Sequence, residues 1–207
     1  MPTARQQILH DIRSTLPVEA ALPALANGWI RYDDPREQFL EMLGAVGGAG
    51  KVVAGRAALR QEIERVRDEV DARQVCSIFP EVVAGNVDLT AIRDPHQLAD
   101  VDLSILPGEL AVAENAAVWV TDARVCERVL YFLSQHVVLV LPAERIVHNM
   151  HEAYQWLHEQ APGGAGPFDA ATWGTFMSGP SKTADIEQAL VIGAHGARSL
   201  HVFLTMP

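Results

Sequence analysis

The heptapeptide HVVLVLP at residues 136–142 contains the longest apolar run of the chain, and the expected fold is built around it. Residues 137–141 are all valine or leucine, and Pro142 ends the run. Strands buried on both faces of a parallel sheet have this continuous apolar character, whereas half-exposed strands alternate. The run is therefore predicted to be a buried strand, and it is far shorter than the roughly 20 residues that a membrane span requires.

On both sides of this strand, strand-like and helix-like segments alternate along the chain. Strands are expected at 51–54, 75–79, 109–114, 117–121, 172–177 and 199–204. Helical patterns cover 35–46, 56–70, 127–133 and 147–157, and the weakly periodic 85–106 is expected to be a loop with at most one short helix. Such alternation requires crossover connections, so it predicts an α/β fold with a mostly parallel sheet and helices on both faces.

No internal repeat and no clear boundary divides the chain, so residues 1–207 are expected to form one domain. Residues 1–16 carry apolar side chains at helical spacing and are predicted to form an amphipathic N-terminal helix. Two segments rich in Pro with Ala or Gly, 18–26 and 162–167, are expected to be a connector and a surface loop.

Composition restricts the partners and the compartment. Asp and Glu number 26 against 16 Lys and Arg, which gives a formal charge of −10. Nucleic acids and anionic membrane faces attract cationic surfaces, so neither is an expected partner. The N-terminus has no apolar core of the signal-peptide kind, and the two cysteines form no CxxC, so we expect a cytoplasmic protein with free thiols.

The motif GPSKTADIE at residues 179–187 is the main candidate for a binding site. It lies between a predicted strand and a helix expected over 183–192, and ligands of open α/β sheets bind at the carboxyl ends of strands. A helix N-terminus offers free amide hydrogens, to which Ser181 and Thr183 add hydroxyls and Lys182 adds a positive charge. Together with Gly179, these groups suit a carboxylate or a phosphate.

A purely structural interpretation of the same motif stays open. Ser or Thr before a helix is commonly an N-cap, and carboxylates in the first turn interact favourably with the helix dipole. Asp185 and Glu187 lie about 200° apart around a helix, so at most one of them can face a ligand. Since 186–192 is apolar on nearly all sides, this helix is expected to be buried, and its carboxylates would then need partners.

Three further groups of residues carry possible chemistry. His195 and Gly196 follow Gly193, which is expected in a left-handed conformation, and His195 is a candidate acid or base. Glu114, next to Asn115 between two apolar runs, is a candidate nucleophile, base or ligand, with a simple turn as the alternative.

His148, His151 and His158 share one expected helix, but only the first two have a chelating spacing. No third ligand lies at the right spacing, so no metal site is expected.

GPSKTADIE, followed by LVIGAHG at 190–196, closely resembles the C-terminal signature of LUD-domain proteins of the lactate-utilisation type. Ala113-Glu114 with the strand after it is similar to that family's Ala-Glu-Thr-Gly segment, although Asn115-Ala116 replaces Thr-Gly. The resemblance covers residues 109–205 well. It implies a fold like that of ribose-phosphate isomerase and the CoA-transferases.

The resemblance also implies a role in oxidising L-lactate to pyruvate beside partner subunits that carry iron–sulfur clusters. Two cysteines cannot supply the four thiolates that a cluster normally takes, so we expect no such cofactor in this chain. Our first hypothesis is therefore a non-redox subunit that binds a small carboxylate or the iron–sulfur partners. The alternatives are an acyl- or CoA-transfer enzyme that uses Glu114, and a scaffold whose motif only caps a helix.

Overall fold

The computed structural model describes residues 3–15, 28–160, 171, 173–183 and 190–207, and the fold is given for these residues. The segments 18–26 and 162–167, expected to be a connector and a loop, lie outside them. Within the described part, no helix is long and apolar enough to cross a membrane.

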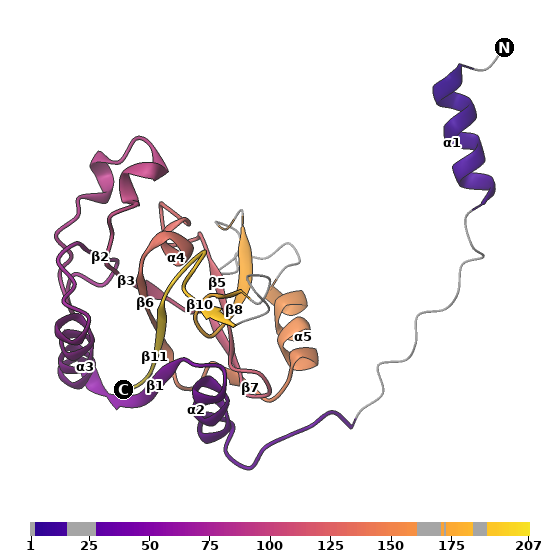
Figure 1. Ribbon diagram of the computed structural model, residues 1–207. Coiled ribbons are helices and arrows are strands. Elements are labelled where there is room, and N and C mark those ends of the chain that lie inside the picture. The colour runs from indigo at the N-terminus through magenta and orange to yellow at the C-terminus, as the bar shows by residue number, and fades with distance from the viewer. Residues whose placement is uncertain (1–2, 16–27, 161–170, 172, 184–189) are drawn as a thin grey trace.

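A five-stranded parallel sheet forms the centre of the molecule (Figure 1), with strand order β1-β11-β6-β3-β2. Its strands are β1 (Ala49–Ala54), β11 (Ser199–Met206), β6 (His136–Pro142), β3 (Leu103–Pro107) and β2 (Val75–Ser77). The apolar run 137–141 is β6, the middle strand, and all five residues are buried. The last strand of the chain, β11, is inserted between β1 and β6, so the sheet is complete only when the C-terminal segment is in place.

Alternate residues of the central strands point into two different cores. Val138 and Val140 pack with α3 (Gly55–Glu69), which covers one face through Leu59, Ile63 and Val66. Val137, Leu139 and Leu141 point to the opposite face, into a larger core that also holds side chains of α2 (Pro35–Ala45) and α4 (Leu130–Leu133). The prediction of a mostly parallel sheet with helices on both faces is confirmed.

A second sheet, which the sequence did not predict as a separate layer, closes the larger core. It has the order β7-β4-β5-β8, with β7 (Ile146–Val147), β4 (Leu110–Val112), β5 (Ala117–Thr121) and β8 (Gly174–Ser178). β5 pairs antiparallel with both β4 and β8. Helix α5 (Met150–Gln160) packs on the far side of this sheet, and the layers are therefore helix, sheet, sheet and helix (Figure 1).

Two predictions of local structure were wrong. The expected loop 85–106 contains the start of the fully buried strand β3 and two short helices, η1 (Leu89–Ala91) and η2 (Pro95–Leu98). The aspartates at 100 and 102 interrupt the apolar pattern immediately before β3, and so they concealed the strand.

The prediction of a helix over 183–192 is also wrong at residue 183 and at residues 191–192, which are strand. β9 (Lys182–Thr183) pairs antiparallel with β10 (Val191–Ile192), and residues 184–189 lie outside the described part. The expected burial fails too, because Leu190 is 65% exposed and Ile192 is 51% exposed. The apolar character of this segment is therefore no sign of a core position.

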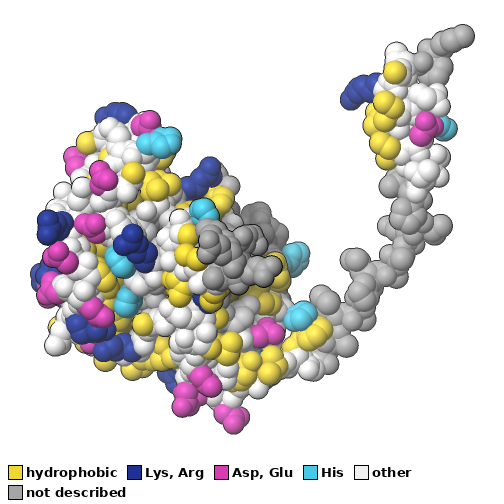
Figure 2. Space-filling view, viewed as in Figure 1, with side chains coloured by type: hydrophobic (Ala, Val, Ile, Leu, Met, Phe, Trp, Pro, Cys, Tyr) yellow, Lys and Arg dark blue, Asp and Glu magenta, His cyan; other side chains and the backbone are white. Residues whose placement is uncertain are grey.

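The N-terminal helix is present as α1 (Ala4–Ser14), close to the predicted 1–16. Thr3 and Gln6 form a capping box at its start, which satisfies amide hydrogens that a helix N-terminus leaves free. No residue of α1 is buried, and its apolar stripe, Ile8, Leu9 and Ile12, is exposed along one side (Figure 2).

Candidate functional site

The GPSKTADIE motif begins where β8 ends and packs against the C-terminal end of α2. Gly179 has a φ of 75°, and a methyl group there would lie 2.6 Å from the carbonyl oxygen of Val46. Only glycine combines this left-handed conformation with so close an approach. The next residue, Pro180, is buried, and a methyl group on Gly47 of the α2 terminus would lie 3.7 Å from its Cγ atom.

Backbone hydrogen bonds hold the described part of the motif after Pro180, residues 181–183, against residues 191–197. The Ser181 N–H donates to the carbonyl of Ala197 at 2.9 Å, and the Ser181 carbonyl accepts from the Gly193 N–H at 2.9 Å. The amide hydrogen of Ser181 is thus consumed, and no helix begins at this point in the described residues. Residues 179–183 therefore do not form the helix N-terminus that the sequence suggested as an anion site. Gly193 has the expected left-handed φ, 74°, but it follows β10 instead of ending a helix.

A pocket of about 330 Å³ opens beside this segment. It brings together five of the eight residues that the sequence proposed as ligand-binding: Gly179, Ser181, Lys182, His195 and Gly196. The other lining residues come from α4, β8, the motif itself and the start of β11: Tyr131, Phe132, Phe176, Met177, Pro180, Ala197 and Leu200. The aromatic residues had no signal in the sequence, because the second sheet and α4 reach the pocket only through tertiary packing.

The pocket lies at the opposite end of the parallel sheet from the one predicted. α4 directly precedes β6, and Ala197 and Leu200 stand at the start of β11, so the pocket borders the amino ends of these strands. The strand that leads into the motif, β8, belongs to the second sheet. The general rule for the carboxyl edge of parallel sheets therefore does not apply to this strand.

Lys182 supplies the positive charge of the pocket. Its side chain is exposed and forms no ion pair with any residue in the described part of the chain. A methyl group on Gly47 would lie 3.9 Å from Lys182 Cε, so the lysine also runs past the C-terminal end of α2. A cation at that end stabilises a helix, and α2 has no basic residue of its own in its last turn.

The other proposed residues divide into three groups. His195 is exposed, Ser181 is partly buried, and a methyl group on Gly196 would lie 3.3 Å from Ser181 Oγ, so these three are close neighbours at the pocket. Thr183 lies in β9 and does not line the pocket. Asp185 and Glu187 lie outside the described residues.

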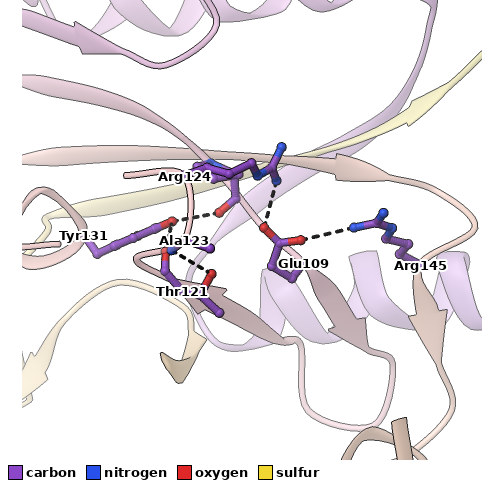
Figure 3. A network of polar contacts seen from close by, with 7 residues as sticks. Glu109, Thr121, Ala123, Arg124, Tyr131 and Arg145 are labelled. Atoms are coloured by element: carbon purple, nitrogen blue, oxygen red, sulfur yellow. Dashed lines mark hydrogen bonds and ion pairs between the residues drawn. The ribbon is translucent and has the colours of Figure 1, made fainter. Parts of the chain in front are cut away.

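Buried polar contacts surround Tyr131, one of the residues that line the pocket (Figure 3). Tyr131 is fully buried, and its hydroxyl lies 3.1 Å from the carbonyl of Pro107 and 3.2 Å from that of Thr121. Burial raises the pKa of Tyr131 far above its usual value, so the phenol stays neutral. Nearby, the Glu109 carboxylate accepts hydrogen bonds from Arg124 at 2.8 Å and Arg145 at 3.1 Å.

Glu114, the proposed nucleophile, does not line the pocket. Its carboxylate accepts a hydrogen bond of 3.0 Å from the N–H of Met150, the first residue of α5. The Asn115 carbonyl accepts a hydrogen bond from the Ser178 hydroxyl at 2.7 Å. Because Ser178 directly precedes the motif, this bond ties the turn at 114–116 to the start of the motif. Ala116, which stands where the family has glycine, has a φ of 54°, so the turn keeps a left-handed residue without glycine.

His148 and His151, which the sequence suggested as a chelating pair, instead contact Tyr32 and Trp29 in the segment before α2. His148 Nδ1 accepts a hydrogen bond from the Tyr32 N–H at 3.0 Å. The His151 ring stacks on Trp29 with centroids 3.5 Å apart. Among the described residues, no group of three His, Cys, Asp or Glu could hold a metal ion.

An iron–sulfur cluster does not fit the two cysteines. Cys76 is buried in β2, and desolvation, with Cys126 as a second contribution, raises its pKa to about 11. A cluster normally takes four thiolates, and this chain has two cysteines.

Comparisons with known proteins identify the relatives of this chain. Residues 92–205 match the model of the LUD domain. The chain is 31% identical over 103 residues to "Lactate utilization protein C" of Geobacillus thermodenitrificans, which covers 50% of this chain and 41% of the relative. It is 30% identical over 153 residues to the protein of that name from Halalkalibacterium halodurans, with 67% and 65% covered.

The chain spans about half the length of the first of these relatives. A solved structure of a DUF162 family protein from Deinococcus radiodurans has the same fold, with a TM-score of 0.59 and 16% identity, over 83% of this chain and 96% of the other. Because the domain match covers more than half of the chain, including the motif and the pocket built on it, this chain belongs to the LUD-domain family.

Proposed function

We propose that this protein is a cytoplasmic component, without a redox centre of its own, of a system that oxidises L-lactate, and that its pocket binds a small carboxylate such as lactate or pyruvate. The name shared by the relatives, lactate utilization protein C, supports the process. The pocket supports the ligand class, because the LUD signature residues 179–182 and 195–196 line it together. Among them, Lys182 carries a positive charge and has no ion-pair partner in the described part of the chain. A positive charge at this place stands out in a chain whose formal charge is −10. This gathering of residues carries the proposal.

In the proposed complex, Lys182 provides the charge that attracts the carboxylate. A carboxylate accepts hydrogen bonds only, so it fits the ammonium of Lys182 and the hydroxyl of Ser181. His195, which also lines the pocket, binds the hydroxyl or keto oxygen of the ligand in this proposal. The aromatic side chains of Phe132 and Phe176 exclude water from one side and leave room for the methyl group.

Electron transfer then requires partner proteins. The two cysteines do not fit a cluster, so we place the iron–sulfur clusters on other subunits that dock with this chain. A pull-down with the tagged chain is expected to recover iron–sulfur subunits of the same system.

Titration calorimetry tests the ligand. The full chain is expected to bind L-lactate or pyruvate, Lys182→Gln to lower the affinity about tenfold, and Lys182→Arg to restore part of it, because one charge-assisted hydrogen bond contributes about that much. Arg56→Gln on α3 removes the same charge far from the pocket and is the matched control. Absence of binding, together with an empty pull-down, would refute the proposal.

Two outcomes separate the competing interpretations. A purely structural role for Lys182 at the α2 terminus predicts a small loss of stability in Lys182→Gln with unchanged binding. Acyl or CoA transfer predicts a covalent adduct on Glu114 after incubation with an acyl-CoA. We expect mass spectrometry to find the peptide unmodified, because this carboxylate is engaged at the start of α5.

A further inference from the structure

A second cavity, of about 360 Å³, adjoins the first. The two share Phe132, His195 and Gly196, and the second extends along Gln135 and Gly193 to Arg198. Phe132 is 42% exposed although it is aromatic, and its ring meets Trp173 edge-on with centroids 5.6 Å apart. Its exposed face therefore forms a common apolar wall between the two cavities.

Each cavity is lined by one Lys or Arg side chain, and the two cavities have different ones. Lys182 lines the first cavity and Arg198 lines the second. Neither forms an ion pair among residues 3–15, 28–160, 171, 173–183 and 190–207. Most other lysines and arginines of the folded body do so, as Arg124 and Arg145 do with Glu109. Unpaired cations that line adjoining cavities of an acidic protein are a favourable place for anions.

The backbone around Arg198 is held in place while its side chain is left free to bind. The Arg198 N–H donates to the Gln135 carbonyl at 2.7 Å, which ties the start of β11 to the start of β6. A methyl group on Gly193 would lie 2.6 Å from Arg198 Cγ, so the glycine leaves the space that the arginine stem occupies. Burial of His136, with the positive charge of Arg198 as the second cause, lowers the pKa of that histidine, which shows that the two side chains lie close enough to interact.

The size of the site exceeds what one lactate needs. A molecule of six non-hydrogen atoms occupies roughly the volume of three or four water molecules, about 100 Å³. The first cavity alone has about three times that volume, and the second is as large again.

We infer that the two cavities form one elongated site for a small organic molecule with two anionic ends, a dicarboxylate. One carboxylate pairs with Lys182 and the other with Arg198, and the carbon chain between them crosses Phe132 and His195. This inference rests on the proposed function, since it makes the lactate pocket one half of a longer site. Because guanidinium binds carboxylates in a bidentate manner, the Arg198 end contributes both charge and orientation.

Calorimetry with a chain-length series tests the inference on the full chain. Succinate, glutarate and adipate are compared with the monocarboxylates butyrate, pentanoate and hexanoate. The best dicarboxylate is expected to bind about tenfold or more tightly than the monocarboxylate of the same length, because it gains a second charge-assisted contact.

Variants then assign the two ends. Arg198→Gln and Lys182→Gln are each expected to reduce the dicarboxylate affinity to that of a monocarboxylate, whereas Arg56→Gln changes neither. Arg198→Lys, which keeps the charge but loses the bidentate geometry, is expected to fall between. Thermal melting of each variant verifies that it folds.

The outcomes also separate this inference from the proposed function. The inference is overturned if the dicarboxylates bind no more tightly than the monocarboxylates of the same length. It is also overturned if Arg198→Gln still prefers dicarboxylates as strongly as the unchanged chain does. In that case, Lys182-dependent binding of lactate or pyruvate still supports the proposed function. Dicarboxylate binding that needs both cations, with no binding of lactate, supports the inference and removes lactate as the ligand.

Discussion

The parallel sheet and the β9–β10 region contain equally apolar sequences, but the fold uses them in opposite ways. Leu139 in β6 is fully buried between strands on both sides, while Leu190 next to β10 is 65% exposed. Both stand in runs of valine, leucine and isoleucine. Apolar side chains buried inside the sheet stabilise the fold, whereas the exposed ones at Leu190 and Ile192 contribute little stability.

Truncating the two leucines gives the largest expected contrast. Leu139→Ala is expected to lower the free energy of unfolding by about 2–5 kcal/mol, because it leaves a cavity in the middle of the core. Leu190→Ala, with the same change in composition, should cost less than about 0.5 kcal/mol. Urea unfolding followed by circular dichroism measures both, and equal losses would contradict the distinction between the two regions.

The Glu109 network is expected to have the next largest effect. Glu109→Gln keeps the shape but removes the charge that two half-exposed arginines share, and a loss of about 1–3 kcal/mol is expected because the Glu109 side chain is only 5% exposed. The control is Glu64→Gln on α3, whose pair with Arg60 is exposed on both sides. Its expected loss is below about 0.5 kcal/mol. A larger loss in Glu64→Gln than in Glu109→Gln would show that burial does not decide the value of these pairs.

Acidification is expected to weaken the parallel sheet through its histidines. Burial lowers the pKa of His136 and His201 below the value of about 6.5 in the unfolded chain. The unfolded state therefore binds more protons, and stability, constant above pH 7, falls as the pH drops through 6.5 towards the folded-state values.

The slope for each histidine should stay below about 1.4 kcal/mol per pH unit, because a single histidine takes up at most one proton on unfolding. Unfolding curves at pH 7.5, 6.5 and 5.5 measure it. His201→Asn should flatten the dependence, and His158→Asn, on the exposed side of α5, should not. An unchanged slope in His201→Asn would remove this explanation.

The smallest expected effect is at the end of α3. Asp71 has a φ of 50°, and the Ala72 N–H donates to the Arg67 carbonyl at 3.0 Å in the pattern of a Schellman motif. Since glycine adopts this conformation without strain, Asp71→Gly is expected to raise the free energy of unfolding by about 0.5–1 kcal/mol. Asp71→Ala, which keeps the strain and also removes the exposed ion pair with Arg73, is the control and should show no gain.

The sequence predicted the parallel sheet better than the site because the two depend on different information. Strands such as β6 and β11 contain enough valine and leucine to be recognised without neighbours. β3 was missed because Asp100 and Asp102 interrupt the apolar pattern immediately before it, and its pairing with β2 and β6 is visible only in the tertiary structure. The hairpin of β9 and β10 was mistaken for a helix because its apolar residues satisfy both periods over so short a segment.

For the site, the motif identified residues that line one pocket, but it did not identify the backbone geometry that brings them together. Gly179, Ser181, Lys182, His195 and Gly196 meet at one pocket. The second cavity, lined by Phe132 and Arg198, had no sequence signal beyond the nearness of Arg198 to His195. Such residues are found only when α4 and the start of β11 are packed together.

The sequence by itself determined the α/β class, the buried central strand, the acidic surface and the signature residues of the family, because periodicity, composition and short motifs are local properties. The tertiary structure decided which end of the sheet carries the pocket, whether an apolar segment is covered, and which cations remain unpaired. These properties depend on contacts between segments distant in the chain: the second sheet and β11 must be in place before Lys182 and Arg198 line adjoining cavities.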